Sequence, residues 1–227
     1  MRLAKILRTP LEFSILFFVS YLRKMNRDTK VAELRLHTAM DVHHPGFSSS
    51  SRILAAYLSK KNFTDANVLD MGAGVGVLGL IAAKKGAKVI AVDNNSLAVQ
   101  LTRMNAERHH LGAKISCIES DLFERISTES AFDYILFNPP FLPKKDAAQK
   151  YGIEQVAAAR LELLQVFFNH AHRFLSQNGR VITIVNSDMP LAKIDQLITE
   201  SGWEIERELS KNSLFRTYST LILKRAI

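Results

Sequence analysis

Short apolar segments alternate with helical patterns along most of the chain, and this alternation limits the possible folds more than any other feature. Seven segments have the length and composition of buried strands, and four stretches with helical periodicity lie among them. Strands that alternate with helices form parallel sheets covered by helices on both faces. The predicted strands cover residues 67–71, 88–93, 115–120, 132–137, 180–186, 203–209 and 219–224, and the predicted helices cover residues 77–85, 96–110, 155–175 and 191–201.

The last two predicted strands have no helix between them. We expect them to form a hairpin through residues 211–216, which adds one antiparallel strand to an otherwise parallel sheet. The predicted fold class is therefore α/β, a doubly wound, Rossmann-like, seven-stranded sheet formed by residues 61–227. Residues 1–60 are expected to form a basic, helical N-terminal extension. Its irregular loop at residues 41–51 is predicted to cross the carboxyl edge of the sheet as a lid.

The first predicted strand runs directly into a glycine-rich turn that opens a helix. The segment reads Val68-Leu-Asp-Met-Gly-Ala-Gly-Val-Gly-Val77. Because Gly72, Gly74 and Gly76 have no side chains, a ligand can approach the main chain around Ala73 and the helix N-terminus. Asp70 ends the buried strand, where a carboxylate is costly without a partner, and a cationic amine on a ligand, or a water bound to it, would supply that partner.

Two further acids follow the next two predicted strands. Asp93, beside Asn94, ends the second strand, where its carboxylate can accept hydrogen bonds from both hydroxyls of a ribose; the alternative role is a helix cap. Asp121, beside Leu122, follows the third strand and is placed to accept from an adenine amino group. Three acids after three successive strands indicate one common cofactor site.

A dinucleotide-binding protein is the alternative for the glycine turn. The run Gly74-Val-Gly76-Val-Leu-Gly79 fits the G-x-G-x-x-G template, with an acid 19 residues after its first glycine. The register opposes this interpretation. The turn starts at Gly72, which puts Val77 at the position of the third glycine and leaves two of the three acids without a role.

The fourth predicted strand ends in Asn138-Pro-Pro-Phe141. Pro139 and Pro140 have fixed φ angles and no N–H, so they make a stiff turn whose carbonyls can face a ligand. An amide or aryl amine is a poor nucleophile until two acceptors hold its hydrogens and direct its lone pair at the electrophile. The Asn138 side-chain oxygen and the Pro139 carbonyl are predicted to be these acceptors, with Phe141 stacked on the flat group.

At these residues the sequence resembles the class I methyltransferases of the small-methyltransferase-domain kind, over residues 43–223. That group includes amine methylases of RNA guanine and adenine and glutamine methylases of release factors. The resemblance implies S-adenosylmethionine as the cofactor. It also implies cofactor contacts at Asp70, Gly72, Gly74, Asp93 and Asp121, and target contacts at Asn138, Pro139 and Phe141.

The resemblance favours an exocyclic amine of a base in ribosomal or transfer RNA as the target. Phe141 in place of a tyrosine is more similar to the ribosomal RNA enzymes, and the N-terminal segment lacks the recognition domain of the release-factor enzymes. Methylation of a protein glutamine, or of a small planar amine at a membrane, remains open. A non-enzymatic RNA-binding module would have disrupted acceptors, whereas Asn138 and Pro139 are intact.

Positive charge is concentrated at the N-terminus. Residues 1–61 contain 11 Lys or Arg against 4 Asp or Glu, a net charge of +7, whereas residues 62–227 carry only +1, from 19 against 18. Such a basic segment can bind RNA phosphates or an anionic membrane surface. Residues 11–22 are apolar but shorter than the roughly 20 residues that span a bilayer. They are expected to pack on the domain, in a dimer or in a membrane interface.

The remaining polar candidates point to a reducing compartment and to no metal. Cys117 has no partner cysteine and lies in an apolar run, so it is interpreted as a small core side chain. The two adjacent histidine pairs, at residues 43–44 and 109–110, lack the spacing of metal ligands. We therefore expect a cytoplasmic protein, with peripheral contact to the inner face of a membrane as the alternative.

Overall fold

The computed structural model describes residues 28–39, 41–140, 153–213 and 216–226. The strands are β1 (Asp28–Val31), β2 (Leu34–His37), β3 (Asn67–Met71), β4 (Lys88–Asp93), β5 (Ile115–Glu119), β6 (Phe132–Phe137), β7 (Leu175–Asn186), β8 (Trp203–Ser213) and β9 (Arg216–Arg225). The α-helices are α2 (Ser49–Leu58), α3 (Val77–Lys84), α4 (Ser96–Arg108), α6 (Ile153–Ala171) and α7 (Leu191–Glu200). Short 3-10 turns cover Pro45–Phe47, Gly112–Lys114 and His172–Phe174.

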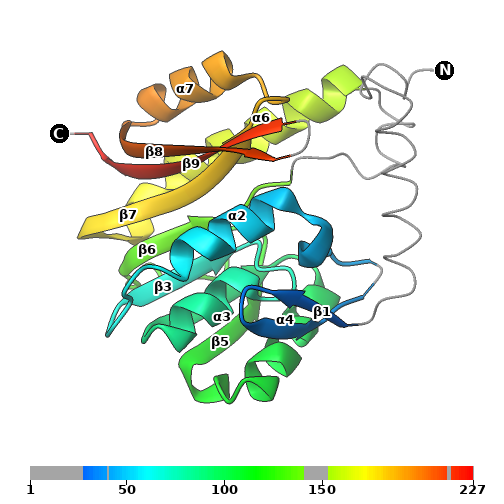
Figure 1. Cartoon of the computed structure of the whole chain (residues 1–227). Coiled ribbons are helices and arrows are strands. Elements are labelled where there is room, and N and C mark those ends of the chain that lie inside the picture. Colours follow the sequence, from blue (N-terminus) through cyan, green and yellow to red (C-terminus); the bar gives the residue numbers. More distant parts are fainter. Residues whose placement is uncertain (1–27, 40, 141–152, 214–215, 227) are drawn as a thin grey trace, which may run out of the picture.

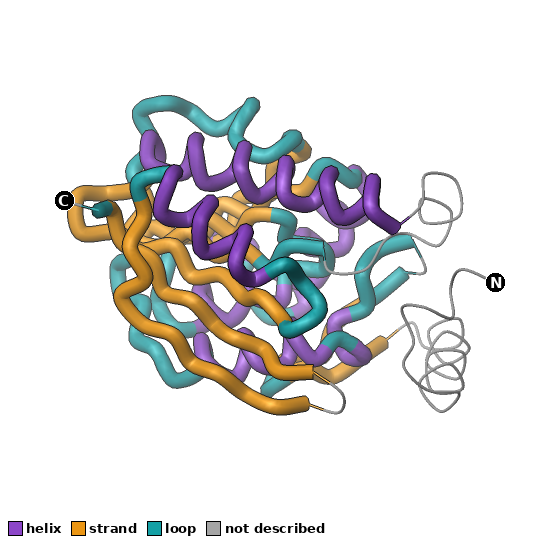
Figure 2. The backbone as a smooth tube through the Cα atoms, turned by 90° about the horizontal axis from the view of Figure 1, so that it is seen from above, coloured by secondary structure: helices purple, strands orange, loops and turns teal. Residues whose placement is uncertain are grey.

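Seven strands form one sheet in the order β5-β4-β3-β6-β7-β9-β8. The strands from β5 to β7 pair in parallel, and β9 runs antiparallel to both β7 and β8. Helices lie on both sides of this sheet (Figures 1 and 2). The predicted doubly wound fold and the terminal hairpin are confirmed. Because β9 lies between β7 and β8, the hairpin leaves β8 as the outermost strand.

Each face of the sheet has its own hydrophobic core, because successive strand residues point to opposite sides. Val68, which is fully buried, packs in a core with residues of α2, α3 and α4. Leu69, its neighbour in β3, is also fully buried but packs in the other core, with residues of α6 and α7. The near-continuous apolar strands are thus explained by burial on both faces.

The helical prediction for the N-terminal extension is wrong for residues 28–37, which form the two-stranded sheet β1-β2. Val31, Leu34 and Leu36 from this hairpin are buried in the core that also contains α2. The spacing of three between Val31 and Leu34 fits a helix, while the spacing of two between Leu34 and Leu36 fits a strand. In so short a segment, the spacing of apolar residues does not distinguish a helix from a strand. The apolar stretch at residues 11–22 lies outside the described residues.

Strand β7 begins five residues before its predicted start. Its pairing with β6 shifts, since Phe132 is opposite Leu175 but Tyr134 is opposite Arg180. Residues 176–179 therefore form an irregularity in the ladder, and their sequence, Ser-Gln-Asn-Gly, has no strand signal. Because these residues are polar and the register shifts there, the sequence pattern did not predict the first part of β7.

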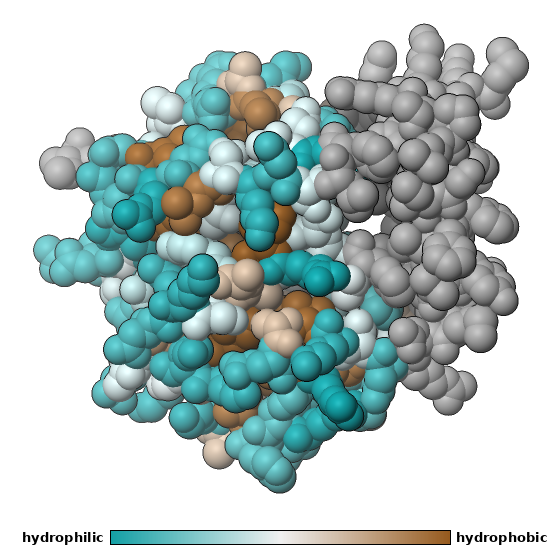
Figure 3. Space-filling model, viewed as in Figure 1, coloured by the Kyte–Doolittle hydropathy of each residue, from teal (hydrophilic) through white to brown (hydrophobic). Residues whose placement is uncertain are grey.

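The surface of the described residues is largely hydrophilic on the face shown in Figure 3. Large hydrophobic side chains that are exposed in the described part of the chain are scattered rather than clustered in sequence: Met104, Val166, Leu191 and Leu209. No helix among the described residues is long and apolar enough to cross a bilayer. Cys117 lies half-buried in β5, where burial raises the pKa of its thiol.

Candidate active site

A cavity of about 400 Å³ opens at the carboxyl ends of β3, β4, β5 and β6. The glycine turn, the acids and the Asn-Pro-Pro turn, which are far apart in the sequence, all contribute to its wall. The predicted site residues that line it are Asp70, Gly72, Ala73, Gly74, Asp93, Asn94, Asp121, Leu122, Asn138, Pro139 and Pro140. Phe141 lies outside the described residues.

The three predicted glycines all have backbone angles that favour glycine. Their φ values are 64° at Gly72, 60° at Gly74 and 86° at Gly76. Gly76 does not line the cavity but caps the N-terminus of α3. A Cβ atom there would lie 2.8 Å from Cγ2 of Thr102. Its role in the structure is therefore to let the turn approach α4, which differs from the predicted contact with a ligand.

Two polar side chains of α4 hold the glycine turn in place, and no sequence pattern predicted either of them. Thr102 donates a hydrogen bond from Oγ1 to the Gly74 carbonyl at 3.0 Å. Asn105, which is fully buried, donates from Nδ2 to the Val75 carbonyl at 2.9 Å and to the His37 carbonyl at 3.1 Å. Its Oδ1 accepts from the His37 N–H at 2.7 Å. Asn105 thus connects the N-terminal hairpin to the turn.

Asp70 is buried at the end of β3 and has one satisfied and one unsatisfied oxygen. Its Oδ2 accepts a hydrogen bond from the Gly79 N–H in the first turn of α3 at 2.8 Å. Its Oδ1 is buried without a hydrogen-bond partner among the described residues. Burial raises the pKa of Asp70 to about 7, the Gly79 hydrogen bond lowers it, and the nearby Asp93 charge adds to the rise. The site therefore favours a cationic partner at Oδ1.

Gly79 allows this arrangement because a Cβ at that position would lie 3.0 Å from Asp70 Oδ2. The third glycine of the run Gly74-x-Gly76-x-x-Gly79 therefore lets the helix approach a strand carboxylate. The glycine at position 79 is therefore explained by this close approach, and no dinucleotide site is needed to account for it.

Asp93 is half-buried between the glycine turn and α4. Its Oδ2 accepts from the Gly74 N–H at 2.8 Å and its Oδ1 from the Asn95 N–H at 3.0 Å. The alternative role as a helix cap is wrong, because Asn95 caps α4 and accepts from the Leu97 N–H at 3.0 Å. A carboxylate has about four acceptor positions, so lone pairs remain for hydroxyl groups in the cavity.

The segment after β5 combines an exposed acid with a constrained backbone. Asp121 is exposed at the wall of the cavity. Leu122 has a positive φ of 43°, an uncommon conformation for a residue with a side chain. Ser120 supports it, donating from Oγ to the Leu122 carbonyl at 3.2 Å and accepting from the Arg125 N–H at 3.0 Å. Such constrained residues are often found at ligand sites.

Asn138 extends from the end of β6 into the same cavity. Its Nδ2 donates a hydrogen bond to Ser51 Oγ at 3.0 Å, while its Oδ1 is buried with no hydrogen-bond partner in the part of the chain that the structure describes. Pro139, next to it, is buried and Pro140 is exposed. The turn that lines the cavity thus contains an unused acceptor atom next to a stiff backbone.

The segment before α2 forms one side of the cavity wall. Asp41, Val42, His43 and Pro45 line it, and His44 is buried. Asn95 Nδ2 donates to the Asp41 carbonyl at 3.5 Å, which joins this segment to α4. Ser51 and Leu163 also line the cavity, although the sequence did not identify them. Among the described residues, no three His, Cys, Asp or Glu side chains are grouped so as to hold a metal ion.

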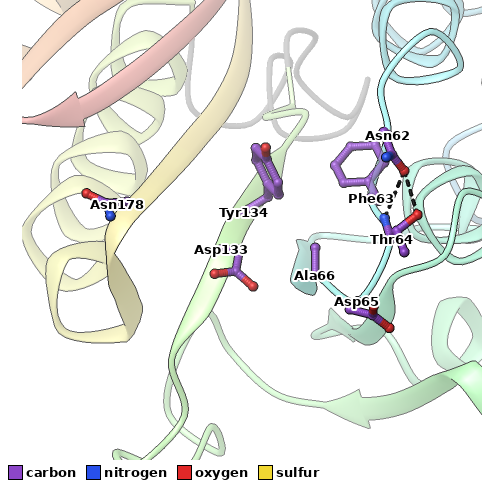
Figure 4. Close-up of a pocket in the computed structure, with 8 residues that line it drawn as sticks. All are labelled: Asn62, Phe63, Thr64, Asp65, Ala66, Asp133, Tyr134 and Asn178. Atoms are coloured by element: carbon purple, nitrogen blue, oxygen red, sulfur yellow. Dashed lines mark hydrogen bonds between the residues drawn. The ribbon is translucent and has the colours of Figure 1, made fainter.

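A second hollow, of about 340 Å³, lies beside the amino ends of β3 and β6 (Figure 4). It contains none of the predicted site residues. Asp133 in its wall accepts hydrogen bonds from the Asn67 N–H at 2.9 Å and from Ser176 Oγ at 3.1 Å. Asn62 likewise accepts from the N–H and the hydroxyl of Thr64, at 3.0 and 2.7 Å. Asp133 thus joins β6 to β3 and β7, whereas Asn62 stabilises its own loop.

Residues 33–217 match the family described as methyltransferase small domain. A putative protein N5-glutamine methyltransferase of Methanocaldococcus jannaschii is 35% identical over 166 residues, which cover 69% of this chain and 77% of that protein. A bifunctional methyltransferase of Rickettsia conorii is 28% identical over 70% of this chain, which spans only 33% of its length.

The fold is also similar to that of a solved 16S rRNA N2 G1207 methyltransferase of T. thermophilus, in complex with AdoMet and guanosine. The TM-score is 0.65 at 22% identity, and the match covers 88% of this chain and 50% of that one. Together with the family match, these likenesses fix the class of the protein. The chain belongs to the methyltransferase small domain family and is an S-adenosylmethionine-dependent methyltransferase.

Proposed function

We propose that this enzyme methylates an exocyclic amine of an RNA base, in ribosomal or transfer RNA, at the turn that Asn138 begins. The observation that carries the proposal is the Asn138 Oδ1, which is buried without a hydrogen-bond partner among the described residues, on a side chain that lines the cavity. An unused acceptor in a cavity is suited to a substrate that brings N–H donors. The strongly basic segment of residues 1–61 supports a phosphate-bearing substrate.

The residues present fit S-adenosylmethionine. The unpartnered Asp70 Oδ1 suits the cofactor's cationic amine, Asp93 suits the ribose hydroxyls, and Asp121 suits the adenine amine. The positive φ angles of Gly72 and Gly74 keep the wall of the cavity free of side chains between these acids. When bound, the cofactor supplies an electrophilic methyl group on a sulfonium sulfur.

The chain's own contribution to the reaction is to orient the target nitrogen. Asn138 Oδ1 accepts one N–H of the amine, and the Pro139 carbonyl accepts the other. With both hydrogens held, the lone pair is turned out of conjugation and toward the methyl carbon. As the new N–C bond forms and the bond from the methyl carbon to sulfur breaks, positive charge moves to the nitrogen, and the two oxygens stabilise it. The electron pair of the broken bond stays on the sulfur, and the methylated nitrogen then releases one proton to water.

Cofactor affinity is expected to increase with pH, because a proton on Asp70 competes with the cationic amine. The raised pKa of Asp70, about 7, means that its charged form becomes dominant only near neutral pH. Between about pH 5.5 and about pH 7.5, affinity measured by calorimetry should rise about 25-fold. Asp70→Asn should remove most of this rise. Asp65→Asn, the same chemical change on an exposed loop, should keep it. An equally steep rise in Asp70→Asn would contradict the assignment.

Asp93→Ala should weaken binding of S-adenosylmethionine by about 1 to 3 kcal/mol, because the variant loses both the ribose contacts and the bond to the Gly74 N–H. Asp93→Asn keeps one acceptor oxygen, so its affinity for S-adenosylmethionine should fall less than that of Asp93→Ala. Calorimetric titration of the three proteins measures both effects. Unchanged affinity in Asp93→Ala would mean that this carboxylate only closes the loop.

The substrate class can be tested directly by labelling. Total RNA and total protein from a strain that lacks the enzyme would be incubated with it and with labelled methyl donor. We expect label in RNA, as a base methylated on its exocyclic nitrogen. RNA affinity should also fall steeply with added salt if residues 1–61 contribute phosphate contacts. Absence of label from RNA would reject the proposal.

Methylation of a protein glutamine is the second candidate. It is favoured by the relative from M. jannaschii, which is named as a putative glutamine methyltransferase and is 35% identical. A glutamine side chain offers the same two N–H donors to Asn138 and Pro139. Label in protein, recovered as N-methylglutamine, would select this function over the first.

A further inference from the structure

Ser51 is the only described residue with a hydrogen bond to the Asn138 side chain. Its Oγ receives the Asn138 Nδ2 donor at 3.0 Å, across 87 positions of sequence. Both residues line the cavity, and Ser51 is 4% exposed. The contact therefore joins the segment before the sheet to the turn after β6, inside the site.

Ser51 is itself held firmly in the first turn of α2. Its N–H donates to Ser48 Oγ, the cap of this helix, at 3.3 Å. Ser48 also bonds Ser50 through their hydroxyls at 2.9 Å. The neighbouring Ser49 accepts from Ser213 Oγ, in β8, at 3.0 Å. The helix end that carries Ser51 is thus fixed from two sides.

The two edges of a carboxamide differ in what they offer a substrate. The oxygen edge accepts hydrogen bonds and the nitrogen edge donates them. The last torsion of asparagine is broad and roughly two-fold, so the side chain alone does not favour one edge. An amine whose hydrogens must be held needs the oxygen edge. Because the nitrogen edge of Asn138 is bound to Ser51, the oxygen edge is the one left for a substrate.

We infer that Ser51 is a positioning residue for methyl transfer, which holds Asn138 with its acceptor oxygen toward the reacting amine. This inference rests on the proposed role of Asn138 as an acceptor. It adds a function for α2, which orients the reaction site in addition to packing on the sheet. It also explains why a buried serine, rather than an alanine, stands at this position of the helix.

The first test compares initial rates of label transfer into total RNA and total protein at saturating donor. Ser51→Ala should be slower by about tenfold, the effect of one buried hydrogen bond. Ser51→Thr keeps the hydroxyl and should recover most of the rate. Ser59→Ala is the matched control, because Ser59 caps the other end of α2, donates its hydroxyl to the Ala55 carbonyl at 2.8 Å and does not line the cavity. Its rate should stay close to that of the wild type.

The second test uses Asn138→Asp, whose two oxygens make the orientation of the side chain irrelevant. In that background Ser51→Ala should change the rate by less than about twofold, because a carboxylate has no donor edge. If Ser51 were purely structural, Ser51→Ala would lower the rate as much in the Asn138→Asp background as in the wild type. That result would contradict the inference.

A third measurement is independent of activity. The side-chain amide protons of Asn138, identified in nitrogen-15 spectra by their absence in Asn138→Asp, should exchange with water at least about tenfold faster in Ser51→Ala, but not in Ser59→Ala. Wild type that labels neither pool would contradict the proposed function. Wild type that labels a pool, together with Ser51→Ala at full rate and unchanged exchange, would overturn the role of Ser51 alone.

Discussion

Asn138→Ala is expected to lower the rate of methyl transfer by about a hundredfold to a thousandfold, the usual loss when a group that stabilises developing charge is removed. Affinity for S-adenosylmethionine should stay within a few-fold, because the Asn138 oxygen is assigned to the amine. Its nitrogen edge bonds only Ser51 among the described residues. Single-turnover rates and calorimetry with the cofactor alone separate the two effects.

The matched control is Asn178→Ala, which makes the same change on an exposed residue beside the second hollow. It should leave both rate and affinity unchanged. If Asn138→Ala lost cofactor binding and rate in equal measure, Asn138 would be a cofactor ligand and the proposed acceptor role would be rejected.

Asn105→Ala is expected to lower the free energy of unfolding by about 3 kcal/mol. The variant loses three hydrogen bonds and leaves the His37 N–H, the His37 carbonyl and the Val75 carbonyl without their partner. Because Val75 follows Gly74, the glycine turn should also loosen and cofactor affinity should fall. Urea unfolding and calorimetry measure the two losses.

Thr102→Val provides a graded comparison, since it preserves side-chain shape and removes only the bond to the Gly74 carbonyl. We expect it to lose about 1 kcal/mol of stability. A loss in Asn105→Ala no larger than that in Thr102→Val would mean that the hairpin does not depend on Asn105 for its attachment.

The sheet could be predicted from the sequence because its strands are buried on both faces and are therefore almost wholly apolar. Segments such as Val68–Met71 have few other stable conformations. The same signal fails at residues 28–37, where the hairpin is stabilised by contacts with α3 and α4 rather than by its own pattern. It also fails at residues 176–179, where an irregular ladder accommodates polar residues.

The part of the site formed by the ends of the parallel strands could be predicted from the sequence. Parallel strands bring their carboxyl ends to one edge, so Asp70, Asp93 and Asn138 meet whatever their separation in sequence. Ser51 and Asn105 could not be found in this way. Their roles depend on long-range hydrogen bonds to single atoms, and serine or asparagine in a helix has no pattern that reveals such a partner.

The position of β8 at the end of the sheet has a consequence for the behaviour of the protein in solution. An outermost strand of 11 residues offers unpaired backbone groups to which another molecule could add a strand. Charged side chains interrupt this rim at Glu204, Glu206, Arg207, Glu208 and Lys211, and the ladder with β9 shifts between Ile205 and Arg207. Charged side chains and a shifted ladder are features by which edge strands disfavour pairing with another chain.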